Sequence, residues 1–350
     1  MRILISGASV AGPALAYRLV RQGHDVTVVE RAPEVRAGGY AVDFRGEAFD
    51  VLERMGVLDE VRGHDTRMRG TVLVDADGAR VGELPPEEFS GGLEVPKADL
   101  TRILHRVTAE DVRYVFDDSI RALTQDEDGV HVTFERSAPG TYDLVVGADG
   151  VWSAVRRLVL GPHDAHVRHL GMSGAGFTTA NRFGLDHQVL LQAVPGRAVL
   201  AFSAHDAERM TVSLSFATDS ARADRLGRAH QEELVRAAFE GAGWEVPRLL
   251  RDMAAADDFL FASTCQVELD RWSVGRVVLV GDAAACAAPT SGMGTSQALV
   301  GADVLARSLN DALAAGGDHR DAFAAYEREL RPSVAANQAK GRAAVALLGG

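Results

Sequence analysis

The first thirty residues alternate between short apolar runs and one helical stretch. Residues 2–6 are rich in Ile and Leu and predict a buried strand. A helical stretch follows to about Gly23, and residues 26–29 predict a second buried strand that ends at Glu30. This order of strand, turn, helix and strand predicts two parallel strands at the start of a doubly wound α/β sheet.

From residue 71 onwards the apolar pattern becomes that of short strands and hairpins. Asp77-Gly78 lies between two apolar segments and is typical of a hairpin turn. Residues 97–107 carry apolar side chains at helical spacing and predict an amphipathic helix. We expect further strands at 72–74, 80–81, 112–116, 120–123, 130–134, 144–146, 189–193, 198–203, 211–216 and 277–280, and further helices at 231–240, 297–309 and 321–348.

These elements predict an α/β protein in which a discontinuous Rossmann-like domain carries an inserted, mainly antiparallel β-sheet domain and a C-terminal helix. We expect the first domain to comprise residues 1–70, 97–165 and 263–320. The inserted domain would comprise residues 71–96 and 166–262, followed by a helical segment over 321–350. The cleft between two such domains is a common place for a ligand.

The turn after the first strand contains Gly7, Ser9 and Gly12 in the spacing of a dinucleotide-binding loop. Such a loop presents its backbone and a helix N-terminus to a pyrophosphate. Ser9 replaces the second glycine, where a small side chain can still fit. Glu30 stands 23 residues after Gly7, where a carboxylate accepts hydrogen bonds from ribose hydroxyls and repels a 2′-phosphate. Either NAD or FAD fits this pattern, and a purely structural glycine turn is the alternative.

Composition and charge exclude several other classes of function. The chain has 350 residues and a net charge of -12, which argues against binding to nucleic acid or to anionic lipid. No apolar run reaches the roughly 18–20 residues of a membrane helix. The N-terminus lacks the features of a signal peptide, so we expect a cytoplasmic protein. Cys265 and Cys286 have no nearby His pair, and we expect no metal site.

Two later segments distinguish FAD from NAD. Residues 143–157 read DLVVGADGVWSAVRR, and residues 275–295 read GRVVLVGDAAACAAPTSGMGT. Together with the first turn and with GGYAVDFRG at 38–46, they resemble the motifs of the class A flavoprotein monooxygenases, the family of para-hydroxybenzoate hydroxylase. Within that family the chain looks most like the hydroxylases of actinomycete aromatic polyketide pathways and the tetracycline-inactivating monooxygenases.

This resemblance implies a bound FAD, with NADPH or NADH as a transient electron donor and O2 as co-substrate. The expected reaction is transfer of oxygen from a flavin C4a-hydroperoxide to an aromatic or polyketide-like small molecule, in antibiotic biosynthesis or modification. The inserted sheet would then be the substrate domain, and the protein would be a monomer or homodimer. The expected FAD contacts are Gly7, Ser9, Val10, Ala11, Gly12, Glu30, Arg31, Lys97, Asp149, Gly281, Asp282, Pro289, Gly292, Gly294 and Thr295.

The third motif has a physical interpretation in this setting. A buried strand ending in Gly281-Asp282 places a carboxylate at the C-terminal edge of a sheet. The turn over residues 289–295 opens a helix, whose free N–H groups would stabilise the negative charge of a reduced flavin. The chain departs from the family at Ala285, where His is frequent, and at Lys97, where Arg is frequent. Lys keeps the charge but loses the planar fork of Arg.

Arg45 is the main candidate for a catalytic side chain, with Asp43 beside it, because this segment passes near the flavin in the family. The alternative for Arg45 is a salt bridge on the surface. His187, Gln192 and His205 lie in the expected substrate sheet, where we interpret them as exposed or structurally satisfied. We interpret Cys286 as a small buried thiol, with a redox role as the alternative. Arg156 and Arg157 could serve FAD, a pyridine nucleotide or surface solubility.

Two other functions remain compatible with these residues. One is an FAD-dependent reductase or dehydrogenase of the same fold, which oxygen consumption would distinguish from a monooxygenase. The other is a protein that binds flavin or an aromatic ligand without turnover, which Ala285 and Lys97 keep open. Flavin-dependent halogenation is disfavoured because its Trp-x-Trp-x-Ile-Pro stretch is absent from the sequence.

Overall fold

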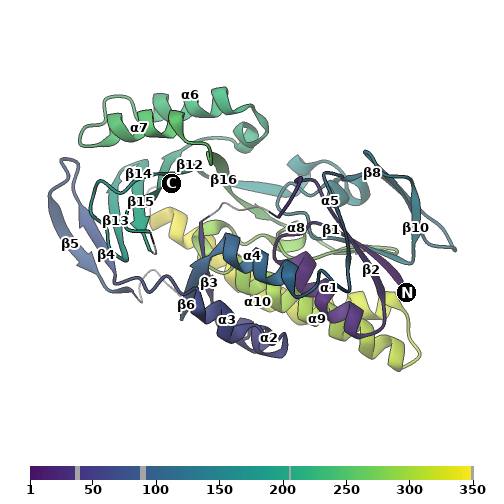
Figure 1. Cartoon of the computed structure of the whole chain (residues 1–350). Coiled ribbons are helices and arrows are strands. Elements are labelled where there is room, and N and C mark those ends of the chain that lie inside the picture. The colour runs from purple at the N-terminus through teal and green to yellow at the C-terminus, as the bar shows by residue number, and fades with distance from the viewer. Residues whose placement is uncertain (36–39, 87–91, 205, 348–350) are drawn as a thin grey trace.

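A computed structural model describes residues 1–35, 40–86, 92–204 and 206–347. Gly38, Gly39 and His205, which the sequence analysis singled out, lie outside the described residues. Figure 1 shows a parallel sheet with long helices packed along it, and a second large sheet that carries α6 (Arg228–Ala238) and α7 (Val246–Ala255) on one side. This arrangement confirms the predicted α/β fold with an added, mainly antiparallel sheet and a helical C-terminal segment.

The six-stranded sheet contains the predicted opening motif. β1 pairs in parallel with β2 on one side and with β11 on the other. Since both neighbours of β1 come later in the chain, the winding reverses at β1, and ligands bind at the carboxyl end of such a switch point. The strands in spatial order are β17 (Ser273–Val274), β18 (Val277–Leu279), β11 (Leu144–Gly147), β1 (Arg2–Ser6), β2 (Asp25–Glu30) and β7 (Arg113–Phe116).

Helices bury apolar faces against this sheet. Leu4 on β1, Leu15 on α1 and Leu299 on α9 are completely buried in one core. α9 begins at Gly294, three residues earlier than the sequence predicted. Four short helices of this part, α2, α3, α5 and α8, were not predicted. The helices of this part are α1 (Ala11–Arg21), α2 (Ala48–Arg54), α3 (Leu58–Gly63), α4 (Lys97–Arg106), α5 (Ala154–Leu160), α8 (Asp282–Ala285), α9 (Gly294–Ala314) and α10 (His319–Leu347).

The second large sheet has seven strands and one parallel pair, between β13 and β4. α6 (Arg228–Ala238) and α7 (Val246–Ala255) cover one of its faces (Figure 1). β16 runs through the expected domain boundary at residue 262, so both expected units contribute to this strand. The strands in spatial order are β16 (Leu260–Val267), β12 (Val167–Ala180), β15 (Arg209–Ala217), β14 (Arg197–Ser203), β13 (Gln188–Val194), β4 (Thr71–Val74) and β5 (Arg80–Leu84).

Two small sheets complete the fold. β3 (Ala41–Phe44) and β6 (Leu93–Pro96) form an antiparallel ribbon, so β6 does not join the seven-stranded sheet. β8 (Ile120–Gln125), β9 (Val130–Phe134) and β10 (Gly140–Tyr142) form a meander. Among the described helices, none has both the length and the apolar character that crossing a bilayer requires.

Candidate functional site

The turn of the first motif contains two glycines, Gly7 and Gly12. A residue with a side chain at either position would force the backbone to move. Gly7 follows β1 with a φ of +112°, and a Cβ placed there would lie 2.4 Å from the carbonyl oxygen of Ala148. A Cβ on Gly12 would lie 1.9 Å from the carbonyl oxygen of Gly7. Because Ala148 belongs to the second motif, the first and second motifs are in direct contact.

Glu30 closes this turn from the end of β2. Its carboxylate accepts hydrogen bonds from the backbone N–H groups of Ala8 and Ala32, both at 2.9 Å. The turn that carries Gly7 and Gly12 is therefore tied to the acidic residue that the spacing singled out. Arg31, the next residue, is exposed.

The third motif meets the first at the end of β18. Gly281 has a φ of +62°, and a Cβ placed there would lie 3.1 Å from the Cβ of Ala11 and 3.7 Å from that of Ala298. The starts of α1, α8 and α9 thus converge on one place. Burial raises the pKa of the neighbouring Asp282 carboxyl, while the positive charge of Lys97 opposes this rise. The charge of Lys97 therefore acts on the Asp282 carboxyl, although the two residues are far apart in the sequence.

The start of α9 offers unpaired backbone donors. No side chain caps this helix and its first turn contains no acidic residue, so the helix itself supplies no negative charge at its positive end. Gly292 before it is left-handed, and Ala288 has a φ of +73°, which is strained for a residue with a side chain. Gly294 and Thr295 belong to the first turn of the helix, whereas Pro289 is exposed in the 3-10 turn η4 (Pro289–Ser291).

Ala285 stands where the family often has His. Its side chain is buried, and its carbonyl oxygen accepts a hydrogen bond from the side-chain amide of Gln297 on α9. This contact ties α8 to α9 without an imidazole.

Asp149 and Arg156 of the second motif have contacts inside the protein. Asp149 accepts hydrogen bonds from Ser153 Oγ and from the backbone N–H of Val155, so it fixes the start of α5. Burial raises the pKa of Asp149. Arg156 is completely buried and donates to the carbonyl oxygens of Val151 and, at 3.0 Å, of Ala283. Arg156 therefore joins the second motif to the third, and the surface role considered for it is wrong.

Arg45 and Asp43 border the start of α9. The backbone N–H of Arg45 donates to Ser296 Oγ at 2.9 Å. Its guanidinium Nε is buried without a hydrogen-bond partner, and it forms no ion pair with the described residues. The surface salt bridge considered for it is not seen. Asp43 Oδ2 lies 3.6 Å from the position that a Cβ on Gly292 would take.

Sequence reasoning missed Glu94 and Thr66. Glu94 lies on β6 directly opposite Asp43 on β3, and Thr66 Oγ1 donates to its carboxylate at 2.8 Å. The signal available was a single acidic residue inside the apolar stretch 93–95, but its partner strand could not be read from the sequence.

The remaining candidates have structural contacts. His187 Nδ1 donates to the carbonyl oxygen of Thr66 at 2.6 Å, and Gln192 Nε2 donates to that of Asp75 at 3.0 Å. Burial raises the pKa of the Cys286 thiol well above its ordinary value, which argues against a reactive thiolate. Both cysteines are free. No cluster of His, Cys, Asp or Glu among the described residues could hold a metal ion.

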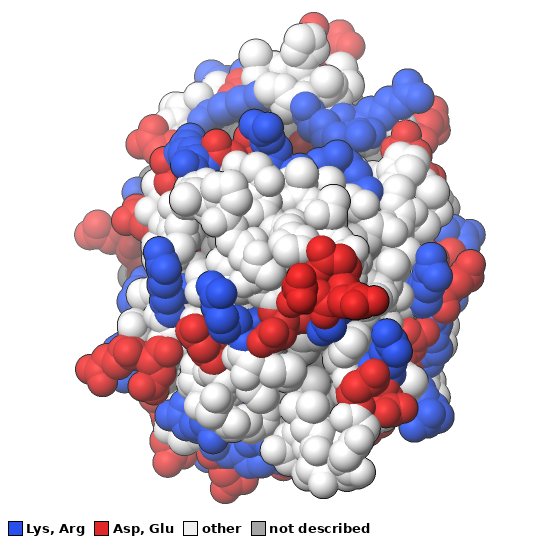
Figure 2. All heavy atoms as spheres, turned by 90° about the vertical axis from the view of Figure 1, so that its right-hand side faces the viewer, with Lys and Arg blue, Asp and Glu red and all other residues white. Residues whose placement is uncertain are grey.

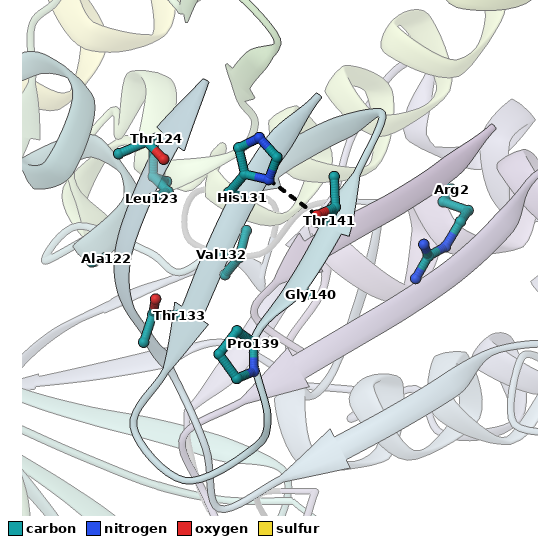
Figure 3. Close-up of a pocket in the computed structure, with 10 residues that line it drawn as sticks. All are labelled: Arg2, Ala122, Leu123, Thr124, His131, Val132, Thr133, Pro139, Gly140 and Thr141. Atoms are coloured by element: carbon teal, nitrogen blue, oxygen red, sulfur yellow. Dashed lines mark hydrogen bonds between the residues drawn. The ribbon is translucent and has the colours of Figure 1, made fainter. Parts of the chain in front are cut away.

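A hollow of ≈ 500 Å³ lies on the meander of β8, β9 and β10 (Figure 3). It includes Arg2, which starts β1, whereas the first motif follows the other end of that strand. The ring of His131 in this hollow already contacts Asp126 and Thr141. On the side of the molecule shown in Figure 2, acidic and basic side chains are interspersed. We therefore place the candidate site at the meeting of the three motifs.

Comparison with known proteins shows the family of the chain. The family model described as FAD binding domain matches residues 1–340. A flavin-dependent monooxygenase from an unknown prokaryotic organism is 40% identical over 344 residues, covering 97% of this chain and 88% of that protein. An uncharacterized protein of Mycobacterium tuberculosis is 44% identical over 343 residues, covering 96% and 91%. The crystal structure of tetracycline destructase Tet(55) is 38% identical, with a TM-score of 0.88 and coverage of 98% and 88%. The chain therefore belongs to the FAD-dependent monooxygenases that share this FAD-binding domain, and FAD is its cofactor.

Proposed function

We propose that this monooxygenase uses NAD(P)H and O2 to hydroxylate an aromatic or polyketide-like small molecule. The observation that carries the proposal is the convergence of the three motifs: Gly7 meets Ala148, Gly281 meets Ala11, and Arg156 donates to Ala283. The seven-stranded sheet is attached to this place, because Val267 at the end of β16 donates a backbone hydrogen bond to Cys286 after α8.

The residues at this convergence fit FAD. The backbone N–H groups at the uncapped start of α9 and the buried Nε–H of Arg45 are hydrogen-bond donors that an acceptor on FAD could satisfy. We assign the pyrophosphate to the Gly7–Gly12 turn, the adenosine ribose to Glu30 and the ribityl chain to Lys97 with Asp282. We assign the isoalloxazine edge to the α9 start and Arg45. Bound there, FAD supplies electron transfer from the nicotinamide and oxygen transfer to the substrate.

The protein's own contribution to the reaction is electrostatic and steric. The positive end of α9 would stabilise negative charge that develops beside it, as a prearranged donor set does in an oxyanion hole. The guanidinium of Arg45 would add a fixed positive charge at the same place. Exclusion of water by the seven-stranded sheet would protect the oxygen transfer from wasteful release of peroxide.

The substrate class is supported by the sheet face that α6 and α7 leave uncovered. Val212, Leu214 and Phe216 on β15 point toward these helices and are buried, so the alternate residues occupy the opposite face. A Cβ on Gly176 of that face would meet no atom closer than 3.9 Å, so the protein does not pack tightly against this position. The central positions of this face are glycines or carry apolar or hydroxyl side chains, and none is charged. They are Gly174, Gly176, Leu191, Leu200, Phe202, Thr211, Ser213 and Ser215.

Such a face suits a flat ring system with hydroxyl or carbonyl substituents. A small aromatic acid would need a cation for its carboxylate, which the central positions of this face do not supply. The similarity to solved tetracycline destructases, at 33% and 38% identity, supports a polycyclic polyketide.

The proposal is tested by measuring NADH and NADPH oxidation together with oxygen uptake by the purified flavoprotein. Tetracyclines and anthracyclines are compared with 4-hydroxybenzoate and with no ligand, and products are weighed by mass spectrometry. We expect polycyclic compounds to stimulate both rates and to gain one oxygen atom. Flavin reduction without oxygen transfer would identify a reductase, and a flavin that no nicotinamide reduces would identify a binding protein.

A further inference from the structure

The ribbon of β3 and β6 has one apolar and one acidic face. Val42 and Val95 form one cross-strand pair and are buried in the core. Asp43 and Glu94 form the next pair, so their side chains project from the other face. Directly opposite residues have Cβ atoms about 4.5–5.5 Å apart, which places two carboxyl groups close together.

Glu94 is held in place by a hydroxyl and not by a cation. Thr66 is 1% exposed, donates its Oγ1 hydrogen to Glu94 Oε1 and donates its backbone N–H to the Glu94 carbonyl, both at 2.8 Å. Among the described residues, no Lys, Arg or His forms an ion pair with Glu94, and no cation contributes to its titration. His187 touches Thr66 through the Thr66 carbonyl oxygen, on the other side of that residue.

The charges near Glu94 are negative. Asp43 on β3 and Asp65 beside Thr66 both disfavour its ionisation. The charged groups of α3 and α4, which flank β6, are engaged elsewhere. These are Arg62 with Asp59, Glu60 with Arg106, and Asp99 with His64 and Arg102. The Lys97 ammonium lies 5.3 Å from the centre of the Tyr40 ring. Burial, opposed by the hydrogen bond from Thr66 and assisted by the two aspartates, raises the pKa of Glu94 to about 7.

The acidic face adjoins the start of α9. Asp43 Oδ2 is the atom nearest to the position that a Cβ on Gly292 would take, and the Asp43 carbonyl oxygen accepts a hydrogen bond from Ser296 Oγ on α9. A change in the charge of the carboxyl pair is therefore a change in the electrostatic potential at this turn.

We propose that Glu94 is a positioning residue that holds a proton beside the Asp43 carboxylate and releases it as pH rises, so that the carboxyl pair gains a negative charge. Ionisation of Glu94 then opposes the positive end of α9. The consequence for FAD binding rests on the proposed function, since the turn is assigned there to the isoalloxazine. The protonation of Glu94 is a property of the protein without FAD, so it does not depend on that assignment.

The first measurement is the unfolding midpoint of the protein without FAD between pH 5 and pH 8.5. A carboxyl with a raised pKa in the folded state stabilises the fold below its unfolded pKa, and this contribution is lost as pH rises through the folded pKa. We expect the wild-type midpoint to fall up to about pH 7, and E94Q to lack this component. D43N removes a like charge, so the fall should end at lower pH. T66V removes the donor to the carboxylate, so the fall should continue to higher pH.

The second measurement is the dissociation constant of FAD over the same pH range. We expect binding to the wild type to weaken several-fold across neutrality and binding to E94Q to stay level. E110Q removes an exposed carboxylate after α4 and should behave as the wild type in both measurements. The inference fails if E94Q keeps the wild-type unfolding profile, or if D43N and T66V move that profile in the same direction. Absence of FAD binding at every pH would contradict the proposed function and leave the unfolding result to decide on Glu94.

Discussion

The six-stranded and seven-stranded sheets fix their functional positions by different means. In the first, backbone atoms approach so closely that a Cβ on Gly7 or Gly12 would collide with a carbonyl oxygen. In the second, one face is packed under α6 and α7. The residues of the other face are identified only because side chains alternate between the two faces of each strand. Positions of the first kind tolerate almost no substitution, whereas positions of the second kind can vary with the substrate. Under the proposed function, the cofactor is thus held by backbone geometry and substrate specificity is carried by replaceable side chains.

Substitution of Gly12 by Ala should have the largest effect, because the added Cβ would lie 1.9 Å from a backbone oxygen. We expect G12A to lose about 4 kcal/mol of stability, as a substitution that forces backbone movement does. The unfolding free energy without FAD measures this directly. Gly294 at the start of α9 has no atom within 4 Å of its Cβ position, so G294A should keep its stability and lose FAD affinity. Equal stability of G12A and G294A would contradict the comparison.

Loss of the buried guanidinium of Arg156 should be the next largest effect. R156A leaves the carbonyl oxygens of Val151 and Ala283 without their donor and creates a cavity. We expect a loss of about 3 kcal/mol from unpaired buried groups and lost packing. The neighbouring Arg157 is exposed and provides the control, since R157A should stay within about 0.5 kcal/mol of the wild type. Chemical denaturation of both variants measures the difference, and similar losses would show that Arg156 does not join the two motifs.

A charge placed on the uncovered face of the seven-stranded sheet tests the other half of the comparison. S213D puts a carboxylate among apolar and hydroxyl side chains, with Leu200 directly opposite on β14. We expect kcat/KM for a polycyclic substrate to fall by about tenfold, which corresponds to about 1.4 kcal/mol, while FAD affinity stays unchanged. A109D adds the same charge at an exposed site after α4 and should leave both quantities unchanged. Weaker FAD binding in S213D would place Ser213 with the cofactor and not with the substrate.

The sequence predicts many strands of both large sheets, and it predicts contacts between distant segments far less well. The parallel pairing of β1 and β2 follows from their apolar runs and the glycine turn between them, and both are found as predicted. The influence of Lys97 on Asp282 and the contact of Glu94 with Thr66 are different, because each involves segments whose approach depends on the completed fold. β12 was missed since its glycines and threonines interrupt the apolar alternation, although it pairs along its length with β15.

Substitution of Asp118, a buried carboxylate near the six-stranded sheet, should have the smallest effect on the free energy of unfolding, and this effect should depend on pH. Burial works against the charge of Asp118, yet hydrogen bonds from the backbone N–H groups of Ser137, Ser119 and Arg136 hold its pKa below the ordinary value. A lowered carboxyl pKa stabilises the fold above the unfolded value, and this stabilisation is lost as pH falls through the folded value. We therefore expect D118N to lose about 1 kcal/mol at pH 7 and progressively less in acid.

The exposed Asp128 offers the matched control for this pH dependence, and D128N should follow the wild type at every pH. Unfolding free energies of the three proteins from pH 7 down to pH 3 provide the measurement. If the loss in D118N stayed constant with pH, the effect would come from altered packing and not from the carboxylate charge. Convergence of D118N with the wild type in acid would instead show that the carboxylate charge of Asp118 stabilises the fold. The connection between β7 and the meander of β8, β9 and β10 would then depend on buried polar contacts as well as on apolar packing.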